Sequence, residues 1–213
     1  VINNNPDGSP GRYTSQLCRR VQEANVELVE ARTLAAVDCL ASRVGEQSDV
    51  GLIITCGSPL VLTDPQNLQE HITKTTAAML HFPNAPVVGI CFGMQLLACL
   101  YGGEISSHVG HGHTPGQYIW LNRLDVPSRF LEGISEHFMQ WGSNYIFVER
   151  TPSRFIATSA DSKGRIMSME HVHEHVYGVQ FHPEVLHEGL GRKLIDGMLS
   201  LLGRNRRDVR LRK

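Results

Sequence analysis

Short apolar runs alternate with helical patterns along the first half of the chain. The runs at 49–59 and 86–90 are candidates for buried strands, and a Gly-Ser-Pro turn closes the first. Residues 65–81 have the pattern of a helix with an Asp-Pro pair at its start. The segment 92–103, FGMQLLACLYGG, is expected to be a helix that ends at two glycines. Strands that alternate with helices predict an α/β domain with a parallel sheet.

The pattern changes between residues 104 and 180, where short strand-like segments are separated by turn residues. We expect these to form a small antiparallel addition that leads back to the central sheet. An amphipathic segment at 190–203 predicts a last helix packed on that sheet. The predicted architecture has three layers, a mostly parallel central sheet with helices on both faces. No linker interrupts the pattern, so residues 1–213 are interpreted as one domain, whose first strand is truncated at Val1-Ile-Asn.

Composition is that of a globular protein with a real core, since 41% of residues are hydrophobic and 19% are charged. The net charge of −1 gives no electrostatic reason to expect nucleic acid or an anionic membrane as a partner. A basic run at 203–213 is interpreted as a solvated tail, with docking on an acidic partner as the alternative. The sequence has no apolar stretch long enough to span a membrane and no signal peptide, which favours a cytoplasmic location.

The cysteines and histidines outside the motifs described below give no strong indication of a metal. The five cysteines show no C-x-x-C spacing and are expected to be reduced thiols. Two histidine clusters lack cysteines and helical H-x-x-x-H spacing, so zinc is the less favoured reading and no metal site is predicted. The clusters are His108, His111 and His113, and His171, His173 and His175. Trp120 and Trp141 are expected to pack against their neighbours.

Candidate chemistry begins at GICFGMQ, where Cys91 stands between Gly89 and Gly93. The pattern G-x-C-x-G after a strand and before a helix is the thiol version of a nucleophile elbow. Glycines suit the positions on either side because neighbouring backbone must pass close to the turn. The helix that starts at Phe92 would direct its free N–H groups at the sulfur and favour the thiolate. The alternative is a core cysteine at a strand end. Cys99, two helical turns further on between Leu97 and Leu100, is the contrasting case and is expected to be a packed thiol.

A thiol nucleophile needs a base, and the segment VYGVQFHPEV at 176–185 offers one. An apolar strand ends at His182, and Pro183 restricts His182 to extended geometry. Glu184 is placed to accept the imidazole N–H and to fix its tautomer. In an α/β sheet Cys91 and His182 would both lie at carboxyl ends of strands, where such sites form.

The two motifs together resemble the class I glutamine amidotransferase family, whose fold is flavodoxin-like. The resemblance implies that Cys91 attacks the carboxamide of glutamine, that His182 is the general base and acid, and that Glu184 orients it. The oxyanion loop of the family aligns with TCGSP, which has Cys56 in place of one glycine. By this resemblance the oxyanion hole is formed by the amides of Gly57 and Phe92. Gln95 and Ser58 are then expected to contact the substrate.

Within the class, the chain is most similar to the amidotransferase part of GMP synthetases, through RYTSQLCRRVQE at 12–23 and its last third. The resemblance implies ammonia transfer to an ATP-pyrophosphatase partner, with no cofactor in this chain because ATP and Mg²⁺ would belong to the partner. Where those enzymes carry a Ser-His-Gly-Asp signature that faces the synthetase, this chain has MQWGSNY at 139–145. Trp141 takes the place of the histidine, and Ser143 that of the aspartate.

Three functions follow from these motifs. The favoured one is a glutaminase that supplies ammonia to a synthetase. The second is a hydrolase of the same fold that cleaves γ-glutamyl amide or peptide bonds without an ammonia acceptor. The third is a binding or regulatory module whose site is formally intact but idle.

Overall fold

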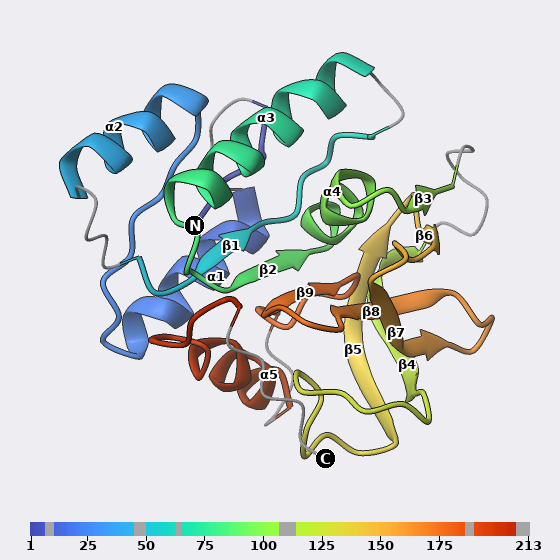
Figure 1. Cartoon of the computed structure of the whole chain (residues 1–213). Coiled ribbons are helices and arrows are strands. Elements are labelled where there is room, and N and C mark those ends of the chain that lie inside the picture. Colours follow the sequence, from blue (N-terminus) through green and yellow to red (C-terminus); the bar gives the residue numbers. More distant parts are fainter. Residues whose placement is uncertain (7–10, 45–49, 63–64, 107–113, 186–189, 208–213) are drawn as a thin grey trace.

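The computed structural model describes residues 1–6, 11–44, 50–62, 65–106, 114–185 and 190–207, which form five helices and nine strands (Figure 1). The helices are α1 (Gly11–Glu23), α2 (Leu34–Val44), α3 (Pro65–His81), α4 (Phe92–Leu100) and α5 (Leu190–Leu199). The strands are β1 (Ile53–Thr55), β2 (Val87–Ile90), β3 (Glu104–Ile105), β4 (Thr114–Arg123), β5 (His137–Asn144), β6 (Val148–Arg150), β7 (Phe155–Asp161), β8 (Ile166–His171) and β9 (Val176–Val179).

Seven of these strands form one mixed sheet in the order β1-β2-β9-β8-β7-β4-β5. Strands β1, β2 and β9 are parallel, and Ile2 extends this part through parallel bridges to Thr55 and Ala31. The pairs β9–β8, β8–β7, β7–β4 and β4–β5 are antiparallel. Strands β3 and β6 form a separate two-stranded sheet.

The α/β class and the helices on both faces are confirmed, but the balance within the sheet differs from the expectation. The antiparallel strands are not a small addition, since they make four of the six strand pairs in the large sheet. One reason is that short connections join β7 to β8 and β8 to β9, and such connections permit only antiparallel neighbours. Parallel pairing needs the crossover helices that are found only in the first half of the chain.

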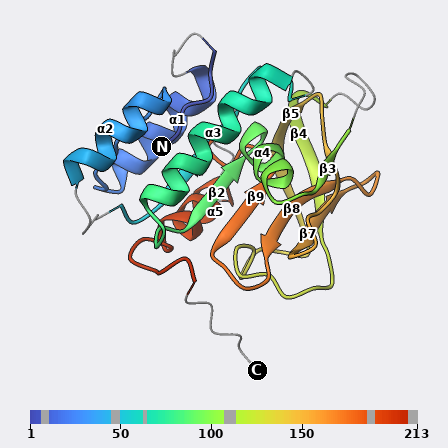
Figure 2. The same ribbon diagram turned by 45° about the horizontal axis from the view of Figure 1, so that its top comes forward.

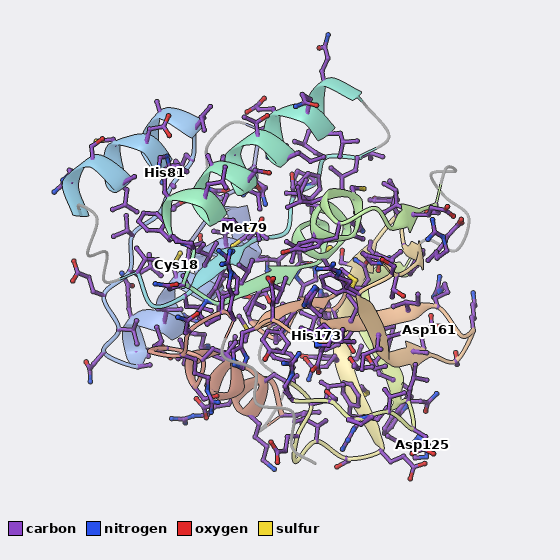
Figure 3. All side chains as sticks on the ribbon, viewed as in Figure 1. Cys18, Met79, His81, Asp125, Asp161 and His173 are labelled. Carbon is purple, nitrogen blue, oxygen red and sulfur yellow. The ribbon has the colours of Figure 1, made fainter. Side chains whose placement is uncertain are left out.

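Two apolar layers hold the sheet between its helices, with α1 and α5 on one face and α2, α3 and α4 on the other (Figures 1 and 2). Successive residues of β2 point to opposite layers, so that Val88 packs with Leu17 of α1 while Val87 packs with Leu97 of α4. Side chains fill the space on both sides of the sheet (Figure 3). The parallel strands are therefore buried on both faces, which explains their continuous apolar sequences.

Helix α4 lies against the backbone of the sheet because glycines occupy the contact. A β-carbon at Gly93 would lie 2.1 Å from the carbonyl oxygen of Thr55. One at Gly89 would lie 2.5 Å from the carbonyl oxygen of Gly93, and one at Gly178 would meet Met94 at 2.7 Å. The expectation that Gly89 and Gly93 allow close backbone approach is confirmed.

The basic segment near the C-terminus is not wholly a solvated tail. Arg206 is buried, and its guanidinium donates hydrogen bonds to the carbonyl oxygens of Met79 and Pro83. Its own carbonyl accepts from the amide of His175 at 2.7 Å. Arg206 therefore docks beside the start of β9, whereas residues 203–205 and 207 are exposed, and residues 208–213 of the predicted tail lie outside the described residues. Among the described residues, no helix is both long enough and apolar enough to cross a membrane.

We expect Gly93→Ala to destabilise the protein by roughly 3 kcal/mol or more, because the new methyl group must push α4 away from β1. Gly197→Ala is the matched control. It lies in α5 with its nearest neighbour 3.9 Å from the added carbon, so it should stabilise the helix by about 0.5–1 kcal/mol. Urea unfolding of the two variants measures both changes, and equal stabilities would contradict the packing role of Gly93.

Candidate active site

Cys91 occupies a sharp turn between the end of β2 and the start of α4. Its backbone angles are φ 53° and ψ −107°, a combination that L-residues rarely adopt and that costs on the order of 1–3 kcal/mol. The Cys91 amide donates to the carbonyl of Val179 in β9 at 2.7 Å, which fixes the turn to the neighbouring strand. The sulfur therefore sits at the N-terminus of α4, as the nucleophile-elbow interpretation requires.

His182 follows β9, the strand that lies beside β2, and forms a buried pair with Glu184. The imidazole Nδ1 and the Glu184 Oε1 are 2.8 Å apart, and the two side chains are 1% and 2% exposed. The backbone amide of His182 donates to the carbonyl of Trp141 at 2.8 Å. The structure thus brings together the two sequence motifs that lie 91 residues apart, because β2 and β9 are parallel neighbours.

Gly57 lies against both of these groups. A β-carbon at this position would be 3.2 Å from Cε1 of His182 and 3.6 Å from Cβ of Cys91. The absence of a side chain therefore leaves room for the imidazole beside the thiol. Among the described residues, Nε2 of His182 has no hydrogen-bond partner of ordinary geometry, which leaves that nitrogen for the reacting groups.

The electrostatic environment favours a charged imidazole. Burial by itself would lower the pKa of His182, but the charge of Glu184, the neighbouring Cys91 sulfur and the hydrogen bond with Glu184 raise this pKa well above its usual 6.5. An imidazolium at neutral pH stabilises a neighbouring thiolate by its positive charge. A cysteine beside an imidazolium is the arrangement that activates cysteine nucleophiles.

A cavity of about 310 Å³ opens over these groups. It is lined by the first turn of α1, the loop after β1, the start of α4 and the end of β5. The lining includes Cys91, His182, Gly57, Ser58 and Gln95, so the cavity gathers most of the residues expected from the sequence. Its size suits a ligand as small as an amino acid.

The oxyanion-hole candidates Gly57 and Phe92 both line this cavity. Among the described residues, neither N–H donates a hydrogen bond to a backbone carbonyl. Free amides beside a nucleophile are suited to stabilise a developing negative charge on oxygen.

Cys56 takes the position in this loop at which the sequence resemblance predicts a glycine. The Cys56 side chain points away from the cavity into the apolar layer that contains Leu17 and Val21. Burial raises the pKa of this thiol to about 12, so it behaves as an inert core residue.

Gln95 is buried at the base of the cavity, where its Nε2 donates to the carbonyl of Ile146 at 2.8 Å and to Oε1 of Gln180 at 3.1 Å. Gln180 in turn points its Nε2 at the Cys91 sulfur, 3.5 Å away. The expected contact of Gln95 with substrate stays a prediction. Ser58 lines the cavity and accepts from the amide of Leu60 at 3.1 Å.

Three residues near the nucleophile and base were not expected from the motifs. Gln180 lies two positions before His182, so alternation along the strand is the signal that places it on the same side. The ring of Tyr13 stacks on the His182 imidazole with centroids 4.1 Å apart. Trp141, expected to pack and to lie in the segment that would face a synthetase, donates from Nε1 to the Tyr13 hydroxyl at 3.0 Å. No sequence pattern would place α1 against the end of β5.

A buried polar network supports the loop after β1. The Asn4 amide donates to Thr55 Oγ1 and to the carbonyl of Cys56, both at 2.8 Å. Its oxygen faces Nδ1 of His71 at 3.1 Å, and Lys74 holds the adjacent carbonyl of Asn3 at 2.9 Å. Helix α3 therefore positions the loop that contains Gly57.

Within the described part of the chain, the other candidates from the sequence are not gathered into a second site. The cluster at 108–113 lies outside the described residues. Over the described ranges, no group of three or more His, Cys, Asp or Glu side chains is arranged to hold a metal ion. The expectation that Trp120 packs is wrong, since it is 63% exposed on β4. A larger cavity of about 480 Å³ beside Phe147 and Arg165 has no cysteine or histidine in its described lining.

Residues 11–200 match a family model that is described as "Glutamine amidotransferase class-I". The chain belongs to this family. The match includes the elbow of Cys91, the His182–Glu184 pair and nearly all of the described elements. The family resemblance inferred from the two motifs is confirmed.

Curated relatives of this amidotransferase chain include GMP synthases. The glutamine-hydrolysing GMP synthase of Acetivibrio thermocellus is 30% identical over 190 residues, which cover 89% of this chain and 34% of the relative. This chain thus spans about a third of the length of that protein. A relative from Thermoplasma volcanium, named as one subunit of a glutamine-hydrolysing GMP synthase, is 26% identical, with 90% of this chain and 87% of the relative covered.

A crystal structure from Thermoplasma acidophilum has the same fold. It is described as a candidate GMP synthase subunit and superposes with a TM-score of 0.69 at 20% identity, over 90% of this chain and 88% of that chain. The mixed sheet with helices on both faces is therefore the fold of known members of the class.

We predict that iodoacetamide alkylates Cys91 first and Cys56 last among the five cysteines at pH 7. The paired imidazolium favours the Cys91 thiolate, whereas Cys56 is buried with a pKa of about 12. Peptide mass spectrometry at timed intervals gives the order, and exposed Cys39 supplies the rate of an ordinary thiol. Labelling of Cys91 at or below the rate of Cys39 would contradict an activated thiolate.

The network around His71 predicts a loss of stability in acid. Burial, and then the charge of Lys74, lower the pKa of His71 to about 4. The unfolded chain binds this proton near pH 6.5 and the folded protein only near pH 4, so the free energy of unfolding falls as pH drops through this window. Urea unfolding at several pH values should show a smaller fall for His71→Gln. The exposed His137→Gln should behave as wild type, and equal slopes in all three would refute the assignment.

Proposed function

We propose that this chain is a glutaminase that hydrolyses the carboxamide of glutamine and supplies ammonia to a synthetase partner of the GMP-synthetase type. The observation that carries the proposal is that Cys91, at a strained turn, and His182, which is paired with the buried Glu184, line one small cavity. A nucleophile, a base and an orienting carboxylate are the parts that acyl transfer requires.

In the first half of the reaction, the Cys91 sulfur attacks the carboxamide carbon. The negative charge that develops on the carbonyl oxygen is stabilised by the N–H groups of Phe92 and Gly57. The His182 imidazolium gives its proton to the leaving nitrogen, so that ammonia departs and a γ-glutamyl thioester remains. The free Nε2 and the raised pKa of His182 support this role as an acid.

In the second half, neutral His182 takes a proton from water as the water oxygen attacks the thioester carbon. The tetrahedral intermediate uses the same two amides, and its collapse expels the Cys91 thiolate and glutamate. Glu184 holds Nδ1 throughout, so Nε2 is the nitrogen that exchanges protons. The strained turn keeps the sulfur at the cavity while both steps occur.

The partner is proposed from the relatives. One of them is named as a single subunit of GMP synthase, and others carry this region as about a third of a longer GMP synthase. We therefore expect a separate chain or domain with ATP-pyrophosphatase activity to use the ammonia. ATP and Mg²⁺ would be bound by that partner, and the proposed steps within this chain use only protein groups.

The direct test is glutamate release from glutamine by the wild-type chain and Cys91→Ala. We expect the substitution to lower the rate by at least about 10³-fold, because the nucleophile is lost. Cys39→Ala is the matched control and should keep wild-type activity, since this cysteine is exposed on α2. If the chain alone is slow, the assay is repeated with an ATP-pyrophosphatase captured by pull-down.

Two outcomes would contradict the proposal. Release of glutamate from γ-glutamyl peptides but not from glutamine would favour a hydrolase without an acceptor. Glutamine turnover that persists in Cys91→Ala would remove Cys91 from the mechanism.

A further inference from the structure

We infer that Tyr13 and Trp141 are positioning residues that hold the His182 imidazole in line with the Cys91 thiol. The inference rests on the function proposed above and deepens it. It assigns the side chains that set the plane of the His182 imidazole, the base in that mechanism. Neither residue was placed in the reaction by the sequence motifs. Tyr13 comes from the first turn of α1 and Trp141 from the edge strand β5.

The stack supplies a restraint that Glu184 does not. A single hydrogen bond at Nδ1 fixes one point of the imidazole but leaves the ring free to turn about that bond. Tyr13 covers one face of the ring at a centroid distance of 4.1 Å and an interplanar angle of 27°. A ring held between a hydrogen bond at its edge and an aromatic face has a defined plane, and with it a defined direction for Nε2.

Trp141 contacts both Tyr13, which stacks on the imidazole, and His182 itself. Its indole Nε1 donates to the Tyr13 hydroxyl at 3.0 Å, which fixes the far end of the tyrosine. Its backbone carbonyl accepts from the His182 amide at 2.8 Å. The three residues thus form a closed triangle, in which one tryptophan positions both the backbone of the histidine and the ring that covers the imidazole.

Core packing does not account for this arrangement. Tyr13 and Trp141 are only half-buried, and neither is a member of the apolar layers that hold the sheet together. Tyr13 instead lines the cavity beside Cys91 and His182. On β4, Tyr118 makes an edge contact with Trp141 at 5.1 Å and is exposed. Tyr118 is therefore a matched aromatic control.

The first experiment measures the alkylation of Cys91 by iodoacetamide at pH 7, relative to the exposed Cys39 in the same molecule. An imidazolium that no longer faces the thiol stabilises the thiolate less, so Tyr13→Leu should lower the ratio by about tenfold. Tyr13→Phe keeps the stack and should restore the ratio to within about twofold of wild type. Tyr118→Leu should leave it unchanged.

The second experiment tests the hydrogen bond with Trp141 by a double-mutant cycle on kcat for glutamine. Tyr13→Phe and Trp141→Phe each remove the same bond, so the double variant should be no slower than the slower single variant. If the fold-losses in kcat of the two single variants multiply in the double variant, the two residues act independently. That result would overturn the role assigned to Trp141. This cycle uses conservative variants and remains decisive if Tyr13→Leu does not fold, which circular dichroism would reveal.

The outcomes separate this inference from the proposed function. Rapid labelling of Cys91 in wild type without glutamine turnover, both alone and with a captured ATP-pyrophosphatase, would contradict the glutaminase function but would not contradict the positioning role of Tyr13 and Trp141. A Tyr13→Leu variant that labels as fast as wild type would overturn the pair whether or not glutamine is hydrolysed. An equal loss in Tyr13→Phe and Tyr13→Leu would do the same, since it would assign the effect to the hydroxyl rather than the stack.

Discussion

The approach of α4 to the sheet is the contact on which the site depends. Gly93 lets the first turn of the helix meet the backbone of β1 at Thr55, with no room for a side chain between them. The chain must then reverse within one residue after β2, and that residue is Cys91. The backbone strain at Cys91 is offset by the packing of α4 against two parallel strands. The position of the sulfur is therefore a consequence of a packing distance.

The remaining parts of the site are supplied by neighbours of those strands. Parallel β2 and β9 end at the same edge, so Cys91 and His182 meet without any long-range loop. The loop after β1 brings Gly57 to the same edge and is held from below by Asn4 and α3. Among the described strands that line the cavity, only β5 belongs to the antiparallel part of the sheet, and it forms the wall of the cavity opposite the parallel strands.

Much of this arrangement could be predicted from the sequence, because local patterns determine it. The glycines around Cys91 and the strand before His182 are short-range signals, and the structure places both where the elbow interpretation put them. The extent of the antiparallel sheet was underestimated, since pairing among 114–179 depends on contacts that no local pattern records. Tyr13 and Trp141 are separated by 128 residues and meet only through the tertiary fold. The burial of Arg206 was missed because a run of charges normally indicates solvent.

The conformation of Cys91 also has a consequence for the stability of the fold. A residue at φ 53° sits where glycine would be comfortable, so the most stable sequence for this backbone would not have a side chain there. A cysteine at that position lowers the stability of the fold, while the residue itself lines the cavity. A side chain at such a position costs stability, and that cost is expected where the side chain serves a reaction rather than the fold.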